Sequence, residues 1–255
     1  MNEEVTVAKR PFYRHDPLTT IVATLGVFLV SQVVAGLLIW LYPATQDWTD
    51  IEATRWLTES VAGQFTYVLL AEVIAITLIF HLLKRAHIMR ARIGWVRPAF
   101  RDVGWSLIAY GIYFMVYLAV IIIAQKLIPS LNVDQEQKIG FDTAYSNLHL
   151  LMTFVSLVVL PPLAEEIIFR GYLYSSLRSK FNFKKATILT SILFGIAHLQ
   201  FGAGAPLLWV AAIDTFILSY FLCYLRERTG SLWAPILLHA IKNCIAYVIL
   251  FGSRL

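Results

Sequence analysis

Apolar side chains run through this sequence in seven long stretches, separated by shorter polar segments. The stretches cover roughly residues 18–41, 61–83, 103–124, 148–177, 186–203, 206–225 and 231–251. A helix needs about 20 apolar residues to cross a bilayer, so the pattern predicts an all-α, polytopic transmembrane helix bundle of about seven spans. Pro161 and Pro162 interrupt the fourth stretch, which predicts a kink or a break in that helix.

The composition also indicates a membrane-embedded chain. Of the 255 residues, 58% are hydrophobic and 15% are charged, whereas soluble domains average about 45–50% and about 25%. These values exclude a disordered chain and leave no basic tail for binding nucleic acid. Cys223 and Cys244 both lie within apolar stretches, where a cysteine is typical of a small buried hydrophobe rather than of a disulfide.

Basic residues are unevenly distributed among the segments that connect the spans. If seven spans alternate in direction, one side carries fifteen of the 21 Lys and Arg residues and the other side carries four. The fifteen are Lys9, Arg10, Arg14, Lys84, Arg85, Arg90, Arg92, Arg97, Arg101, Arg178, Lys180, Lys184, Lys185, Arg226 and Arg228. Because cytoplasmic loops are enriched in Lys and Arg, we expect the N-terminus in the cytoplasm and the C-terminus outside. We expect a multi-pass protein of a cell membrane, in particular a prokaryotic plasma membrane.

Ionisable side chains within the spans point to function, because such a group is costly in a membrane unless it has a partner or faces water. The spans contain Glu72, Glu165, Glu166, Arg170, His198, Asp214, His239 and Lys242. At about 1.5 Å per helical residue, Glu165 and His198 lie roughly 18 Å, and His239 roughly 12 Å, from the cytoplasmic ends of their spans. We therefore expect these three side chains to share one layer of the bundle.

Spacing along the fourth span separates a structural role from a chemical one. Glu166 and Arg170 are four residues apart, so they can pair on one face of a helix. Glu165 then lies about 100° away as the freer carboxylate, in an environment suited to a general base.

The remaining polar residues supply the other groups that hydrolysis of a carbonyl requires. His239 and Asn243 are four residues apart and can both face one cavity, while Phe194 shares a helix face with His198 and is expected to fix it by packing. A carboxylate and a histidine can activate a water molecule, and a second histidine and an amide can bind an oxyanion. The sequence contains no His-Glu-x-x-His and no Gly-x-Ser-x-Gly, and a single aspartate within the spans excludes an aspartyl dyad.

Three short motifs resemble those of one known family. Glu165-Glu166-Ile-Ile-Phe-Arg170 matches the EExxxR signature of the CPBP family of intramembrane endopeptidases, which are CAAX proteases and bacteriocin-processing enzymes, also called the Abi family. Phe194-Gly-Ile-Ala-His198 matches its FxxxH motif, and His239-Ala-Ile-Lys-Asn243 matches its HxxxN motif. The motifs occur in family order on successive spans. We therefore predict two regions, a tail with three variable spans over 1–147 and a CPBP-like catalytic four-span core over 148–255.

The resemblance implies an endopeptidase that hydrolyses a peptide bond near or within the membrane. In the family's scheme Glu165 is the general base, His198 holds the water, and His239 and Asn243 stabilise the oxyanion. The substrate would be a membrane-associated or lipidated protein or peptide. A metal-free glutamate mechanism is favoured, and zinc bound by Glu165, His198 and His239 is the alternative.

Lys242 stands within the third motif, where the resemblance implies a neutral residue. An unpaired lysine at this depth is costly, so we predict a carboxylate partner from another span. Asp214 and Glu72 both lie at the depth of Lys242, about 16 Å from the cytoplasmic ends of their spans. We favour Asp214, because sequential helices joined by a short turn tend to pack together.

Two other classes of function stay open. A non-catalytic membrane scaffold or a bacteriocin-immunity protein would keep the bundle, but it would not need Glu165, His198, His239 and Asn243 at depth. A transporter would show inverted repeats and broken helices, and only the Pro161-Pro162 pair suits it.

Overall fold

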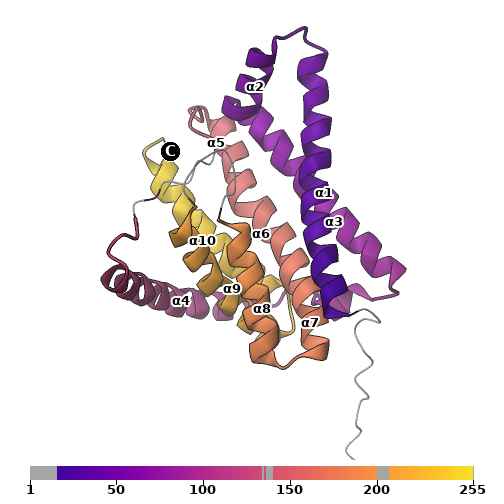
Figure 1. Ribbon diagram of the computed structural model, residues 1–255, viewed down its shortest axis with the longest axis vertical. Coiled ribbons are helices and arrows are strands. Elements are labelled where there is room, and N and C mark those ends of the chain that lie inside the picture. Colours follow the sequence, from indigo (N-terminus) through magenta and orange to yellow (C-terminus); the bar gives the residue numbers. More distant parts are fainter. Residues whose placement is uncertain (1–15, 134, 136–139, 200–206, 255) are drawn as a thin grey trace, which may run out of the picture.

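The computed structural model describes residues 16–133, 135, 140–199 and 207–254, and all regular structure in this part of the chain is helical (Figure 1). The elements are α1 (Pro17–Ala44), α2 (Asp50–Glu59), α3 (Val61–Arg85), η1 (Arg90–Ile93), α4 (Phe100–Leu127), α5 (Asn147–Phe154), η2 (Val155–Val159), α6 (Leu160–Glu165), η3 (Glu166–Tyr174), α7 (Ser175–Lys180), α8 (Phe183–Ala197), α9 (Trp209–Thr229), α10 (Trp233–Phe251) and η4 (Gly252–Arg254). The prediction of an all-α, polytopic helix bundle is confirmed.

Six helical stretches in the described residues are long and apolar enough to cross a membrane. They are Pro17–Ala44, Val61–Arg85, Phe100–Leu127, Asn147–Lys180, Trp209–Thr229 and Trp233–Arg254, and each overlaps one predicted span. The predicted span 186–203 corresponds to α8, which has only 15 residues. A helix of that length extends about 22 Å, less than the ~30 Å hydrocarbon core. The predicted span also includes residues 200–203, which lie outside the described residues, so the count of seven spans stays a prediction.

The fourth span is one long helical stretch from Asn147 to Lys180, and the predicted break at the two prolines is not observed. Instead, α6 contains both prolines and is flanked by two π-helical segments, η2 and η3. In η2 the Leu160 N–H donates to the Val155 carbonyl, five residues back. Because Pro161 and Pro162 have no N–H to donate, the helix passes them by a change of hydrogen-bond register.

The connecting segments that the charge count assigned to one side do lie at one end of the bundle (Figure 1). At this end Thr20 contacts Ser176, Arg178 pairs with Glu227, and Arg226 donates to the Arg92 carbonyl. The start of α1, the α7–α8 turn, the segment after α3 and the α9–α10 turn are therefore neighbours. This is the arrangement that alternating spans require, and the orientation of this end toward the cytoplasm stays a prediction.

The core is centred on η3, whose nine residues are all buried. It packs against α1, α3, α8 and α9, and its apolar side chains belong to the largest hydrophobic cluster. On the other side α4 packs against α9 and α10 through a second cluster that includes Tyr113 and Leu218. The predicted boundary at residue 147 is therefore crossed by extensive packing. This central position of η3 buries Glu166 and Arg170 of the EExxxR motif.

Candidate active site

Glu166 is the buried centre of an interaction between η3 and α10. Its Oε1 atom accepts a hydrogen bond from Arg170 Nη1 at 2.9 Å and contacts His239 Nδ1 at 3.0 Å. The Glu166 and Arg170 side chains are fully buried, and the Arg170 guanidinium lies 4.4 Å from the centre of the Phe194 ring. The predicted Glu166–Arg170 pair is thus present. When Glu166 is ionised beside Arg170, Oε1 can only accept, and His239 then donates to it from Nδ1.

Glu165 has a different environment from its neighbour. Its side chain is 19% exposed, and its Oε2 atom lies 4.0 Å from His239 Nε2, beyond hydrogen-bonding distance. This oxygen is buried and has no hydrogen-bond partner among the described residues. The freer carboxylate expected at Glu165 therefore faces the unoccupied nitrogen of His239.

His198 follows the last residue of α8, and a carbonyl in the last turn of that helix holds its ring. Its Nδ1 atom lies 2.7 Å from the Phe194 carbonyl oxygen, which can only accept, so Nδ1 carries the proton. The Phe194 and His198 rings are 4.7 Å apart, as the predicted packing requires, and Phe194 also contacts the edge of the His239 ring at 6.0 Å. In its neutral form His198 therefore presents Nε2 as an acceptor.

Asn243 is anchored by a carbonyl that the two prolines leave free. Its Nδ2 atom donates to the Leu157 carbonyl at 2.9 Å. In an α-helix that carbonyl would accept from residue 161, and in a π-helix from residue 162, and both of these are prolines. The fourth span thus supplies the acceptor that orients the Asn243 amide, and neither Leu157 nor the prolines entered the predicted set of site residues.

Lys242 pairs with Asp214, the partner favoured by the short turn that joins their two helices. Its Nζ atom lies 3.2 Å from Asp214 Oδ2, and Tyr113 of α4 donates to Asp214 Oδ1. Glu72, the rival partner, lies on α3, which packs against α6 rather than against α10. The predicted pairing is confirmed, and Tyr113 extends it to a third helix that the sequence did not point to.

Within the described residues, no three His, Cys, Asp or Glu side chains are grouped so that they could hold a metal ion. Glu165, His198 and His239, the ligands of the zinc alternative, do not form such a group. We therefore derive no chemical step through a metal.

The motif residues fall within a region that matches a known family. Residues 147–245 match the family model described as "Type II CAAX prenyl endopeptidase Rce1-like". The resemblance to the CAAX-protease family is confirmed. The matched CAAX-protease region contains Glu165, His198, His239 and Asn243, and it begins at α5.

Three curated proteins are similar to this chain over part of their length. The chain is 36% identical over 98 residues to "Putative membrane peptidase YdiL" of Bacillus subtilis (strain 168), which is 38% of this chain and 36% of that protein. It is 31% identical over 105 residues to "Uncharacterized 24.3 kDa protein" of Escherichia coli, 40% of this chain and 45% of that protein. It is 24% identical over 126 residues to "UPF0177 protein YxdF" of Lactococcus lactis subsp. lactis (strain IL1403), 49% and 63% of the two chains.

The chain therefore spans less than two thirds of each of these relatives. No solved structure matches it. The similarity to CAAX proteases rests on the region that begins at α5, and α1 to α4 lie outside the family match.

Proposed function

We propose that this protein is an intramembrane endopeptidase in which Glu165 activates a water molecule for attack on a peptide carbonyl. The contrast between two adjacent carboxylates carries the proposal. Glu166 is fully buried, and its Oε1 atom is held by Arg170 and His239 although its Oε2 atom has no partner, whereas Glu165 is 19% exposed and its buried Oε2 atom has no hydrogen-bond partner in the described part of the chain. A partly exposed carboxylate without a cation or a donor bound to it is free to take a proton, which is what a general base requires.

The proposed reaction uses the free nitrogens of the two histidines. His198 Nε2 accepts a hydrogen bond from the water, and Glu165 removes a proton as the water oxygen attacks the carbonyl carbon. The resulting oxyanion is bound by His239 and Asn243. Glu165 then gives its proton to the leaving amine as the C–N bond breaks. Because Nδ1–H of His239 is committed to Glu166, its Nε2 donates to the oxyanion when both ring nitrogens carry a proton.

The proposed substrate is a membrane-associated or lipidated protein or peptide. The match to type II CAAX prenyl endopeptidases supports a C-terminal, prenylated peptide as the first substrate to test. A peptide with a prenylated cysteine three residues before its C-terminus should be cleaved, and the same peptide without the prenyl group serves as the control. Equal cleavage of both would support a peptidase that does not recognise the lipid.

The proteolytic function itself is tested by comparing membranes that contain the wild-type protein with membranes that contain Glu165→Gln. Peptides released by the wild-type protein should be absent from the variant, provided that both proteins insert to the same level. An unchanged peptide profile would favour the non-catalytic scaffold or immunity role.

A further inference from the structure

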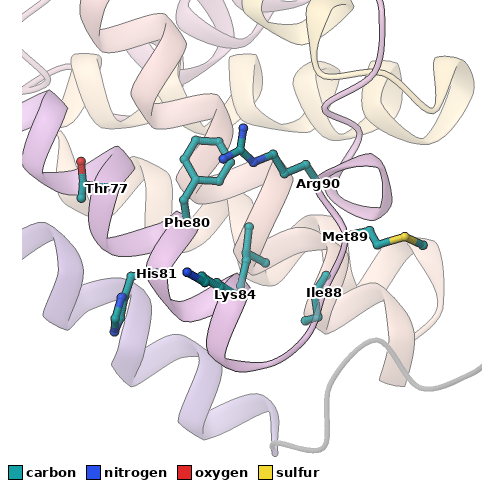
Figure 2. Close-up of a pocket in the computed structure, with 8 residues that line it drawn as sticks. Thr77, Phe80, His81, Lys84, Ile88, Met89 and Arg90 are labelled. Carbon is teal, nitrogen blue, oxygen red and sulfur yellow. The ribbon is translucent and has the colours of Figure 1, made fainter.

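A basic pocket of about 460 Å³ lies at the end of α3, where the chain turns into η1 (Figure 2). Its lining includes Thr77, Phe80, Lys84, Ile88, Met89 and Arg90. In Figure 2 the Arg90 side chain extends from the turn back toward Phe80 on α3. This pocket is at the basic end of the bundle, and it shares no residue with the candidate active site.

A tight reversal of the chain builds this basic pocket. Helix α3 ends as the Ile88 N–H donates to the Leu83 carbonyl, and His87 between them has φ of 55°, a left-handed conformation that is uncommon for residues other than glycine. The reversal brings the segment from Ile88 to Arg90 back against the last two turns of α3. With the His87 N–H donating to the Lys84 carbonyl, these two hydrogen bonds form the Schellman motif that commonly ends a helix, and here it sets the shape of the pocket wall.

Two cations in the basic pocket, Lys84 and Arg90, pair with no carboxylate of the described residues. The Arg90 guanidinium carbon lies 4.7 Å from the centre of the Phe80 ring, so a cation–π contact orients its donors. No ion pair within the described residues involves Lys84 or Arg90. The sequence from 77 to 93 contains no Asp or Glu. In contrast, Arg170, Arg178 and Lys242 each pair with a carboxylate.

The basic pocket also has the position and surface of a headgroup site. Lys84 lies in the last turn of a candidate membrane span, while Val73, Thr77, Phe80 and Lys84 follow one face of α3 from the middle of that span to the pocket. Val73 is 51% exposed and Met89 is 69% exposed, so apolar surface borders the charged part. Cations at the end of a span beside exposed apolar side chains are typical of contact with phospholipid.

We propose that the basic pocket binds the headgroup of an anionic phospholipid. Its phosphate would contact the Arg90 guanidinium, which can donate two parallel hydrogen bonds to phosphate oxygens, and Lys84 on the α3 side of the pocket would add a second positive charge. The acyl chains would follow the Val73–Thr77 face of α3. This site is additional to the proposed peptidase and does not depend on it.

The test measures lipid retention by the full-length protein in nanodiscs that contain phosphatidylcholine with a minority of phosphatidylglycerol. The wild-type protein should retain phosphatidylglycerol over phosphatidylcholine, as measured by native mass spectrometry. In Lys84→Gln/Arg90→Gln this preference should fall about tenfold or more. The reason is that each Lys or Arg near the membrane surface increases the affinity for an anionic lipid several-fold. The matched control is Arg85→Gln/Arg92→Gln, which removes the same charge from the same segment outside the pocket lining and should keep the preference.

Equal losses in the two double variants would overturn the proposal in favour of general electrostatic attraction. A second arm adds inorganic phosphate, with sodium chloride of equal ionic strength as control. If millimolar phosphate displaces phosphatidylglycerol while chloride does not, the site is one for a free anion and the lipid assignment is wrong. Arg90→Lys keeps the charge but loses the paired donors, so the proposal expects an intermediate preference.

Discussion

Nδ1 of His239 lies 3.0 Å from Oε1 of Glu166, the same oxygen that accepts a hydrogen bond from Arg170 at 2.9 Å. One carboxylate oxygen therefore joins α10 to η3 and fixes the orientation of the His239 ring. Glu165, the residue that precedes Glu166 in the chain, takes no part in this connection. The two glutamates of the EExxxR motif should consequently respond differently to the same substitution.

Glu165→Gln should abolish peptide hydrolysis and leave the thermal unfolding of the detergent-purified protein unchanged, because it removes a base without breaking a contact. Glu166→Gln should lower activity and also destabilise the protein by about 3–5 kcal/mol, since it leaves Arg170 buried without a counter-charge. Each variant is the matched control for the other. Normal activity in Glu165→Gln, or an equal loss of stability in both, would contradict the assigned roles.

Pro161 should control activity through Asn243. Pro161→Ala restores an N–H that can donate to the Leu157 carbonyl within the helix, so the carbonyl no longer needs Asn243 as its donor. We expect activity to fall toward that of Asn243→Ala, which should lose about a hundredfold in kcat as an oxyanion donor does. Thermal stability should stay the same or rise.

Pro162→Ala distinguishes the two hydrogen-bond registers, because its new N–H faces the Val158 carbonyl in the α register and the Leu157 carbonyl in the π register. Activity in Pro162→Ala should stay close to that of the wild-type protein when residues 161 and 162 keep the α register of α6, and it should fall as in Pro161→Ala when they extend the π register of η2. Full activity in Pro161→Ala would show that the Leu157 contact does not position Asn243 for the reaction.

The Lys242–Asp214 pair should behave as a coupled unit in thermal unfolding. Asp214→Asn and Lys242→Met should each destabilise by about 2 kcal/mol, less than a fully buried pair, because the side chains are 15% and 26% exposed. The double variant should be less destabilised than the sum of the two by about 1 kcal/mol. Glu72→Gln combined with Lys242→Met is the control, and its losses should add. Additive losses for Asp214 and Lys242 would be inconsistent with a coupled pair.

Removal of metal ions should leave the reaction unchanged if Glu165 and His198 activate the water by themselves. The measurement is peptide cleavage by the wild-type protein after the protein has been dialysed exhaustively against a chelator, together with the zinc content of the purified protein. Stoichiometric zinc, with activity lost on its removal and regained on its return, would overturn the metal-free proposal. His198 and His239 would then be the first ligands to test.

Local spacing and depth were sufficient to predict several contacts of the site. The Glu166–Arg170 pair follows from a four-residue separation on a helix, which needs no knowledge of the rest of the fold. The Lys242–Asp214 pair follows from equal depth on two helices joined by a short turn, because antiparallel neighbours bring such positions together.

Other features depend on packing and hydrogen-bond register, which periodicity does not report. The bond from His239 to Glu166 requires that α10 lie against the fourth span, and the donation by Tyr113 requires that α4 lie beside α9. The two prolines predicted a kink or a break, but π-helical segments on both sides keep the span helical. Hydrophobicity predicts a span over 186–203 but not the place where its helix ends, and α8 ends at Ala197 within that apolar stretch.

The end of α8 at Ala197 bears on how water, the second reactant of a hydrolysis, could reach His198. The helix extends about 22 Å, so a start at the membrane surface, as the sequence predicts, would place its end within the ~30 Å hydrocarbon core. Beyond this point the backbone of His198 and Leu199 turns back on the Gly195 and Ile196 carbonyls instead of continuing the helix. Non-helical backbone at this depth is stable only where protein buries it or water reaches it. For the proposed peptidase, a helix end at this depth would leave His198 in contact with water or protein rather than with lipid, and hydrolysis inside a membrane requires such access for water.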